Sequence, residues 1–148
     1  MSEEQPKELP LYKVRANQVG MVAAIAVAII FQYPWLLAVT WIILVMTRLL
    51  GSGANAFVIV FEPITKLIYG EKHTEAEELQ HFNLNLAIIF ITTSLLCFSL
   101  SWNLAGYIVA GVMGLCALLA LFGFCIGCTL YFQLKKYRAL RDRKIKEQ

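Results

Sequence analysis

Charged residues are scarce in this sequence and are missing from long stretches of it. Only 16% of the 148 residues are Asp, Glu, Lys or Arg, whereas 59% are hydrophobic. A soluble globular domain usually carries about a quarter charged residues and at most about half apolar ones. The shortage of charge therefore excludes an ordinary water-soluble domain and predicts a membrane protein.

Four apolar runs are long enough, or nearly so, to cross the ~30 Å hydrocarbon core of a bilayer, which takes about 20 helical residues. We expect transmembrane helices over residues 17–33, 35–50, 82–100 and 104–132. Pro34 separates the first two, because proline lacks a backbone donor and disfavours helix in the residue before it. The predicted fold class is an all-α membrane protein in which four transmembrane helices form two in-out-in hairpins within a single domain.

The two expected outer turns, between the members of each hairpin, contain no ionisable residue. Lys and Arg residues gather instead in the N-terminal tail 1–15, around the central connection 54–80 and in the C-terminal tail 135–148. The positive-inside rule then places both termini in the cytoplasm. The basic tail carries no aromatic or glycine pattern of a nucleic-acid-binding module, so we expect the lipid bilayer, and no nucleic acid, as its partner.

The central connection begins with an apolar stretch that Glu62 and Pro63 interrupt. It is too short to span a bilayer, and its helical spacing predicts an amphipathic segment in the cytoplasmic interface. A re-entrant loop that brings Glu62 to a polar cavity is the open alternative. His73 and His81 lie near three glutamates, a pattern more typical of a solvated helix than of a ligand set. We expect no metal and no cofactor.

Side-chain amides stand where the first and third spans begin. Asn17 and Gln18 follow Arg15 in the first, and Asn83 and Asn85 open the third. This correspondence suggests a parallel internal repeat, in which each half contributes one hairpin. Such amides commonly hydrogen-bond between helices. Arg15, Asn17 and Gln18 are also a candidate binding site, because they would share a leaflet with a pair of cysteines.

All four cysteines lie inside expected spans. Cys97 and Cys116 are isolated, and lone buried cysteines usually pack as small apolar residues. Cys125 and Cys128 form a C-x-x-C pair within reach of the cytosol, which makes them a candidate redox or sulfur-handling site. One continuous helix over 104–132 would place the pair near a partly negative C-terminal end, which disfavours a thiolate. Chemistry and simple packing therefore both remain open for the pair.

Two glycines, Gly123 and Gly127, lie one helical turn apart beside these cysteines. Small residues at this spacing let another helix approach closely. We predict a helix-packing face there, and we expect leucine to disturb the bundle more at position 127 than at Gly106.

Three segments carry a family resemblance: "VRANQ" at the first span, "FNLNLA" at the third and "GFCIGCTLYFQLKKY" at the end of the fourth. They resemble a bacterial family of small four-helix membrane proteins without an assigned activity, domain-of-unknown-function family forty-three ninety-five. The resemblance implies a multi-pass protein of the bacterial inner membrane. Genes of this family often lie near genes for thioredoxin-like and rhodanese-type proteins, so the resemblance implies a cytosolic partner of one of these types and a role in thiol or sulfur metabolism. Cys125 and Cys128 match the cysteines of the family motif.

Three functions follow from these observations. The first is a thiol-redox or sulfur-handling membrane protein that acts through the C-x-x-C. The second is a small homo-oligomeric transporter or permeation protein for a sulfur species, and the third is a non-catalytic membrane scaffold. The sequence does not decide whether the protein is an enzyme.

Overall fold

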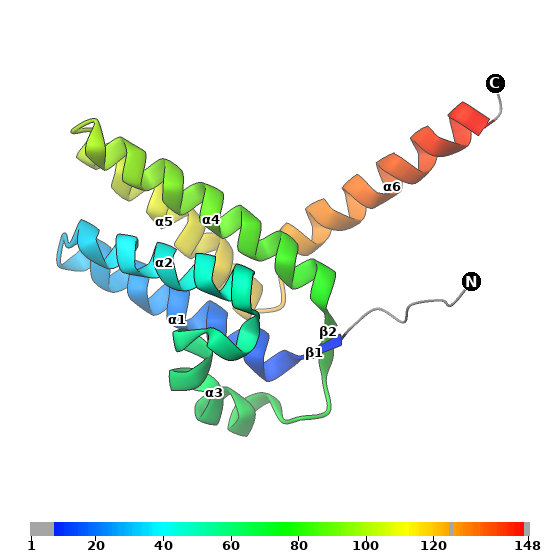
Figure 1. The fold of residues 1–148 in the computed structure, drawn as a ribbon, viewed down its shortest axis with the longest axis horizontal. Helices are drawn as coiled ribbons and strands as arrows, with labels where there is room; N and C mark the ends of the chain where they lie inside the picture. The colour runs from blue at the N-terminus through cyan, green and yellow to red at the C-terminus, as the bar shows by residue number, and fades with distance from the viewer. Residues whose placement is uncertain (1–7, 125, 147–148) are drawn as a thin grey trace.

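The computed structural model describes residues 8–124 and 126–146 of the chain. Six α-helices dominate this part, and Figure 1 shows α1, α2, α4 and α5 bundled side by side, with α3 beside α1 and α6 projecting away. The all-α prediction is confirmed. The helices are α1 (Leu11–Ile30), α2 (Pro34–Leu50), α3 (Ala56–Tyr69), α4 (Glu77–Ser99), α5 (Asn103–Leu121) and α6 (Ile126–Lys146), with a short 3-10 helix over Ser52–Ala54.

Three of these helices, α1, α4 and α5, are long and apolar enough to cross a membrane. The helix α2 is also apolar but has only 17 residues. Outward-facing side chains of the bundle are apolar as well, for example Trp35 at 80% exposure and Leu104 at 76%. A helix that is hydrophobic on its outer face too is typical of a membrane span. The chain is a membrane protein, as its composition predicts.

The turns that follow α1 and α4 have the same backbone structure. The N–H of Tyr33 donates to the carbonyl five residues earlier at 3.0 Å, and the N–H of Trp102 does the same at 2.8 Å. Gln32 and Ser101, the residues just before them, have left-handed backbones with φ of 55° and 63°. This combination is the Schellman motif, which ends a helix by satisfying its last carbonyls. Both helices thus end for the same local reason.

A third turn of this kind divides the predicted helix 104–132 in two. The helix α5 ends at Leu121 and α6 begins at Ile126, which differs from the single span that the sequence suggested. Gly123 has a φ of 91°, and the N–H of Phe124 donates to the carbonyl of Leu119 at 3.0 Å. Glycine adopts this left-handed backbone without strain, so Gly123 ends α5 and separates it from α6.

This break also removes Gly123 from the predicted packing face. A Cβ added at Gly123 would have no atom within 4 Å, so no helix approaches it closely among the described residues. Gly127 lies in the first turn of α6, and its surroundings fall outside the described residues. The close helix contacts are elsewhere. A Cβ at Gly20 would come within 3.0 Å of Phe57, and one at Gly106 would lie 2.8 Å from the ring of Phe98. A leucine at Gly106 would therefore meet the ring of Phe98, and its comparison with position 127 falls outside the described residues.

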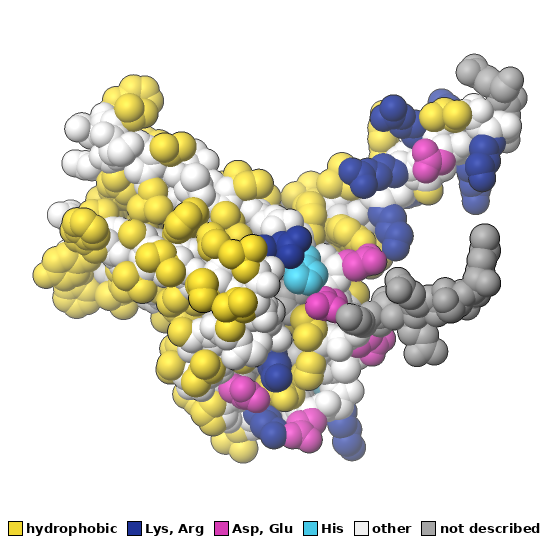
Figure 2. Space-filling model, in the orientation of Figure 1, with side chains coloured by type: hydrophobic (Ala, Val, Ile, Leu, Met, Phe, Trp, Pro, Cys, Tyr) yellow, Lys and Arg dark blue, Asp and Glu magenta, His cyan; other side chains and the backbone are white. Residues whose placement is uncertain are grey.

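Two short strands close the charged end of the bundle. The strand β1 (Glu8–Pro10) pairs antiparallel with β2 (Thr74–Ala76), which joins the start of α1 to the start of α4. Figure 2 shows charged side chains over this end, along α6 and around α3, whereas the end with the two hairpin turns is apolar or uncharged on the visible face. The bundle therefore has one charged and one uncharged end.

Candidate functional site

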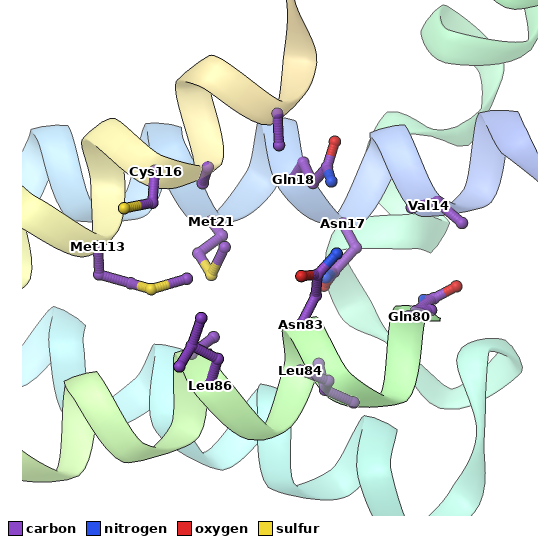
Figure 3. A pocket seen from close by; sticks show the side chains of 13 residues that line it. Val14, Asn17, Gln18, Met21, Gln80, Asn83, Leu84, Leu86, Met113 and Cys116 are labelled. Carbon is purple, nitrogen blue, oxygen red and sulfur yellow. The ribbon is translucent and has the colours of Figure 1, made fainter. Parts of the chain in front are cut away.

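A cavity lies between α1, α4 and α5, in the half of the bundle toward the charged end (Figure 3). Its volume is about 50 Å³. Side-chain amides line one side of it, and apolar and sulfur-containing side chains line the other. The lining residues are Val14, Asn17, Gln18, Met21, Gln80, Asn83, Leu84, Leu86, Ala87, Met113, Cys116, Ala117 and Ala120.

Helix α3 holds one of the amides in place. The Asn55 side chain is completely buried, and its Nδ2 donates to Oδ1 of Asn17 at 2.6 Å. The Oδ1 of Asn55 also caps α3 by accepting from the N–H of Phe57 at 2.8 Å. An N-cap of this kind satisfies a backbone donor that the helix leaves open. The same asparagine thus begins α3 and fixes Asn17 at the cavity.

Arg15 connects α1 to the end of α5 beside the cavity. Its Nη1 donates to Oε1 of Gln18 at 3.2 Å and to the backbone carbonyl of Ala120. Its guanidinium also lies 5.7 Å from the ring centre of Tyr69, at the end of α3. Arg15 therefore bridges three helices, and two of its partners line the cavity.

Glu75 in β2 is a carboxyl group whose pKa responds to the charge of Arg15. It is half-buried, and this burial raises the pKa of Glu75 above its usual 4.5, although the charge of Arg15 lowers it. Burial disfavours the ionised form of a carboxyl group, whereas a nearby cation favours it. The desolvation effect is the larger of the two.

The raised pKa of Glu75 predicts a pH-dependent contribution to stability. The carboxyl group of Glu75 binds its proton more tightly in the folded protein than in the unfolded chain. The contribution of Glu75 to the free energy of unfolding therefore becomes unfavourable as pH rises from about 4.5 through the raised pKa. Melting temperatures in detergent between pH 4 and 7 should show this fall, and Glu75→Gln should remove it. Glu71→Gln is the control with the opposite sign, because Lys66 lowers the pKa of Glu71. A slope that Glu75→Gln leaves unchanged would contradict the assignment.

One amide at the cavity has an unsatisfied acceptor. Gln80 in α4 is only 6% exposed, and its buried Oε1 has no hydrogen-bond partner in the described part of the chain. A buried polar atom without a partner costs about 1–3 kcal/mol.

His81, the residue after Gln80, contacts a glutamate of its own helix. Its Nε2 lies 3.3 Å from Oε1 of Glu77, one turn earlier. The described residues contain no cluster of three His, Cys, Asp or Glu side chains that could hold a metal ion.

Sulfur atoms border the apolar side of the cavity. Cys116 is a half-buried free thiol in α5, Met113 lies one turn before it, and Met21 faces them from α1 (Figure 3). Cys97, the other cysteine whose side chain the structure describes, does not line the cavity. Cys116 was predicted to pack, and the structure places its side chain at a cavity wall.

The predicted site residues have different outcomes. Arg15, Asn17 and Gln18 lie together, with the two amides lining the cavity. Cys125 lies outside the described residues. Cys128 falls in the first turn of α6, and its side chain is likewise outside the description.

Gln80 and Cys116 were not predicted as cavity residues, and Asn83 was interpreted as an amide that hydrogen-bonds between helices. A signal for all three was present in their spacing. Gln80 and Asn83 are three residues apart, as are Met113 and Cys116, and this spacing places side chains on one face of a helix.

The break between α5 and α6 also reverses the argument about helix charge. The C-x-x-C pair was expected near the negative C-terminal end of one long helix, where a thiolate is disfavoured. The helix α6 instead begins at Ile126, directly after Cys125 in the chain. Helix N-termini carry partial positive charge and stabilise thiolates. The helix boundaries therefore remove the main physical objection to a reactive pair.

Comparison with known proteins identifies one protein family. A model of the family described as domain of unknown function (DUF4395) matches residues 9–136. No curated protein and no solved structure matched the sequence.

Proposed function

Because this chain belongs to the DUF4395 family and is a membrane protein, we propose that it exchanges thiols and disulfides at the cytoplasmic face of a bacterial inner membrane through Cys125 and Cys128. One observation carries this proposal. Ala120 is the last cavity-lining residue of α5, and the C-x-x-C begins five residues later in the sequence, directly before α6 starts at Ile126.

The membrane arrangement follows from length and charge. We propose that α1, α2, α4 and α5 all cross the bilayer, because α2 packs against α1 and α4 and its 17 residues would extend over about 25 Å. Lys and Arg residues lie toward one end of this bundle, which favours a cytoplasmic position for both termini. The α1–α2 and α4–α5 turns would then face the opposite side.

Helix α3 fits a position in the cytoplasmic interface. Its outward side chains are apolar, with Leu67 exposed at 87%, while Lys66 pairs with Glu71 just beyond its end. A helix with one apolar and one charged side lies in the plane of the headgroups. The tight contact between α3 and α1 would hold α1 at a fixed depth in the bilayer.

The proposed chemistry needs only the two cysteines and a disulfide-bearing partner. The thiolate of one cysteine attacks a sulfur of the partner's disulfide, so that a mixed disulfide forms and the partner's other sulfur leaves as a thiolate. The second cysteine then attacks the mixed disulfide and releases the partner in its dithiol form. Two electrons pass to the partner, and an intramolecular disulfide remains in the protein. A cytosolic thioredoxin-like or rhodanese-type protein fits the partner's role.

Serine substitutions test this proposal on purified, reduced protein in detergent with hydroxyethyl disulfide as the defined probe. In wild type, mass spectrometry should show an internal disulfide and no lasting adduct. One of the two variants, Cys125→Ser or Cys128→Ser, should retain a stable mixed disulfide with the probe, because the resolving thiol is gone. Variants that melt like wild type exclude a folding defect. Equal adducts on all four cysteines in wild type would contradict a paired site.

A permeation pathway is less well supported. Beyond the cavity the described core is mainly apolar, with Ile25, Leu37 and Ile91 among its buried side chains. The buried hydroxyls of Thr40 and Ser94 already donate to backbone carbonyls. A polar solute would lose its hydrogen bonds there. A route would therefore have to form between copies in a homo-oligomer.

A further inference from the structure

We propose that a groove between α4 and α6 binds an anionic phospholipid through the phosphate of its headgroup. The groove lies where α6 leaves the bundle beside the first turns of α4 (Figure 1). Its volume is about 400 Å³, and its lining residues are Glu78, Phe82, Tyr131, Leu134, Lys135 and Arg138. The inference goes beyond the proposed function, because it does not depend on the exchange reaction of the cysteines.

Two contacts of Tyr131 form the groove by holding α6 against α4. The hydroxyl of Tyr131 donates to Oε2 of Glu78 at 2.6 Å, and its ring centre lies 5.8 Å from that of Phe82. Lys135 and Arg138 follow Tyr131 at spacings of four and three residues, which places all three on one face of α6. The contacts with α4 therefore turn a basic face of α6 toward the groove.

The two cations of the groove have no acidic partner in the described part of the chain. No ion pair there involves Lys135 or Arg138. Glu78 is the one carboxylate among the lining residues, and its Oε2 already accepts the hydroxyl of Tyr131. Two cations and one carboxylate leave the lining with a net positive charge. A guanidinium can donate two parallel hydrogen bonds to a phosphate, and an ammonium beside it adds a second positive charge.

The apolar part of the groove favours a lipid over a soluble phosphate. Phe82 and Leu134 line it, and Leu134 is 52% exposed. Phe82 lies in the second turn of α4, which is one of the helices that could cross a membrane. The groove thus joins the apolar part of a span to the basic residues beyond it, which is where phospholipid headgroups lie. Basic pockets of this kind beside membrane helices bind anionic headgroups.

The test is a lipid titration of the purified full chain in a neutral detergent, with bound lipid counted by native mass spectrometry. Dioctanoyl phosphatidylglycerol is the anionic probe, and dioctanoyl phosphatidylcholine has the same chains without net charge. We expect one molecule of phosphatidylglycerol to bind saturably and phosphatidylcholine to bind more weakly. Inorganic phosphate should not displace the lipid, because it makes no use of the apolar wall.

Two double variants separate the groove from the rest of the basic tail. Lys135→Gln/Arg138→Gln should raise the dissociation constant of phosphatidylglycerol about 30-fold, which corresponds to about 1 kcal/mol for each cation. Arg143→Gln/Lys146→Gln removes the same charge at the same spacing from α6, outside the groove, and should have a much smaller effect. All four side chains are exposed, so both variants should keep the fold.

Glu78→Gln should have the opposite effect and tighten binding of phosphatidylglycerol. It removes the negative charge from the groove, and the amide oxygen can still accept the hydroxyl of Tyr131. Asp142→Asn is its control, because Asp142 is an exposed carboxylate of α6 that does not line the groove. The control should change the affinity for the lipid much less than Glu78→Gln.

Four results would overturn the proposal. Equal weakening by the two double variants would mean a diffuse attraction of the basic tail for lipid. Phosphatidylcholine that binds as tightly as phosphatidylglycerol would remove the role of charge, and displacement by inorganic phosphate would indicate a site for a soluble anion. Polyglutamate that binds through Lys135 and Arg138 in preference to the lipid would indicate an acidic protein surface as the partner.

Discussion

Gly20→Ala should destabilise the protein by about 1–3 kcal/mol, because it adds a methyl group where α3 already touches α1. The nearest atom to the new Cβ would be the Cβ of Phe57, within 3.0 Å. Rotation of the phenyl ring cannot move that atom, so α3 itself has to shift. The shift would also disturb the hydrogen bond between Asn55 and Asn17 at the cavity.

Gly111→Ala is the matched control in α5. A Cβ there would lie 3.7 Å from Ile29, which is an ordinary contact. Alanine also favours the helix over glycine by roughly 1 kcal/mol. Thermal melting in detergent should therefore separate a destabilised Gly20→Ala from a neutral or stabilised Gly111→Ala. Equal melting temperatures for the two variants would show that α3 does not pack on α1 as described.

Arg15→Met should destabilise the protein by about 1.5–3 kcal/mol, the range for hydrogen bonds that involve a charged group. The substitution keeps much of the aliphatic length but removes the donors to Gln18 and to the carbonyl of Ala120. It also leaves the half-buried Glu75 without its nearby cation. The melting temperature should fall, and it should fall more at pH 7 than at pH 4, where Glu75 is protonated.

Arg48→Met tests whether any arginine at this end of the bundle would have the same effect. Arg48 is exposed, and its Nε donates a hydrogen bond to Oδ1 of Asn85 at 3.1 Å. Surface substitutions of this kind usually change stability by less than about 0.5 kcal/mol. If both methionine variants melted alike, Arg15 would not be the bridge between α1 and α5.

Local sequence signals predicted most of the fold. The apolar runs placed α1, α2, α4 and α5 within a few residues in most cases, because a stretch that is apolar all round forms a buried or membrane helix. Apart from the end of α5, the largest differences are at two helix starts. The helix α1 starts at Leu11 rather than at 17, and α4 starts at Glu77 rather than at 82, because both helices continue past the apolar residues into the charged end of the bundle.

The break at Gly123 was the main feature that hydropathy could not indicate. Residues on both sides of it are apolar, so the run appears continuous. The signal was the glycine itself, which is the usual residue at the left-handed position of a Schellman motif. Gln32 and Ser101 occupy the same position after α1 and α4, and neither residue type marks such a turn clearly.

The cavity could be predicted only in part. Arg15, Asn17 and Gln18 stood out because they begin the first span and would share a leaflet with the cysteine pair. Gln80, Met113 and Cys116 come from other helices, and their meeting depends on how α1, α4 and α5 pack. The pairing of Glu8 with Ala76 likewise joins residues far apart in the sequence, which no local pattern specifies.

The most direct test of the central claim is the accessibility of Cys125 and Cys128 to a maleimide that does not cross membranes. Cys97 and Cys116 are first replaced by alanine, so that the pair provides the only thiols, and Cys125→Ser/Cys128→Ser in that background sets the blank. Inverted inner-membrane vesicles should be labelled, sealed right-side-out cells should not, and prior oxidation should block labelling at both cysteines together. Labelling in sealed cells, or labelling of one cysteine that oxidation leaves unchanged, would contradict a cytoplasmic thiol–disulfide pair.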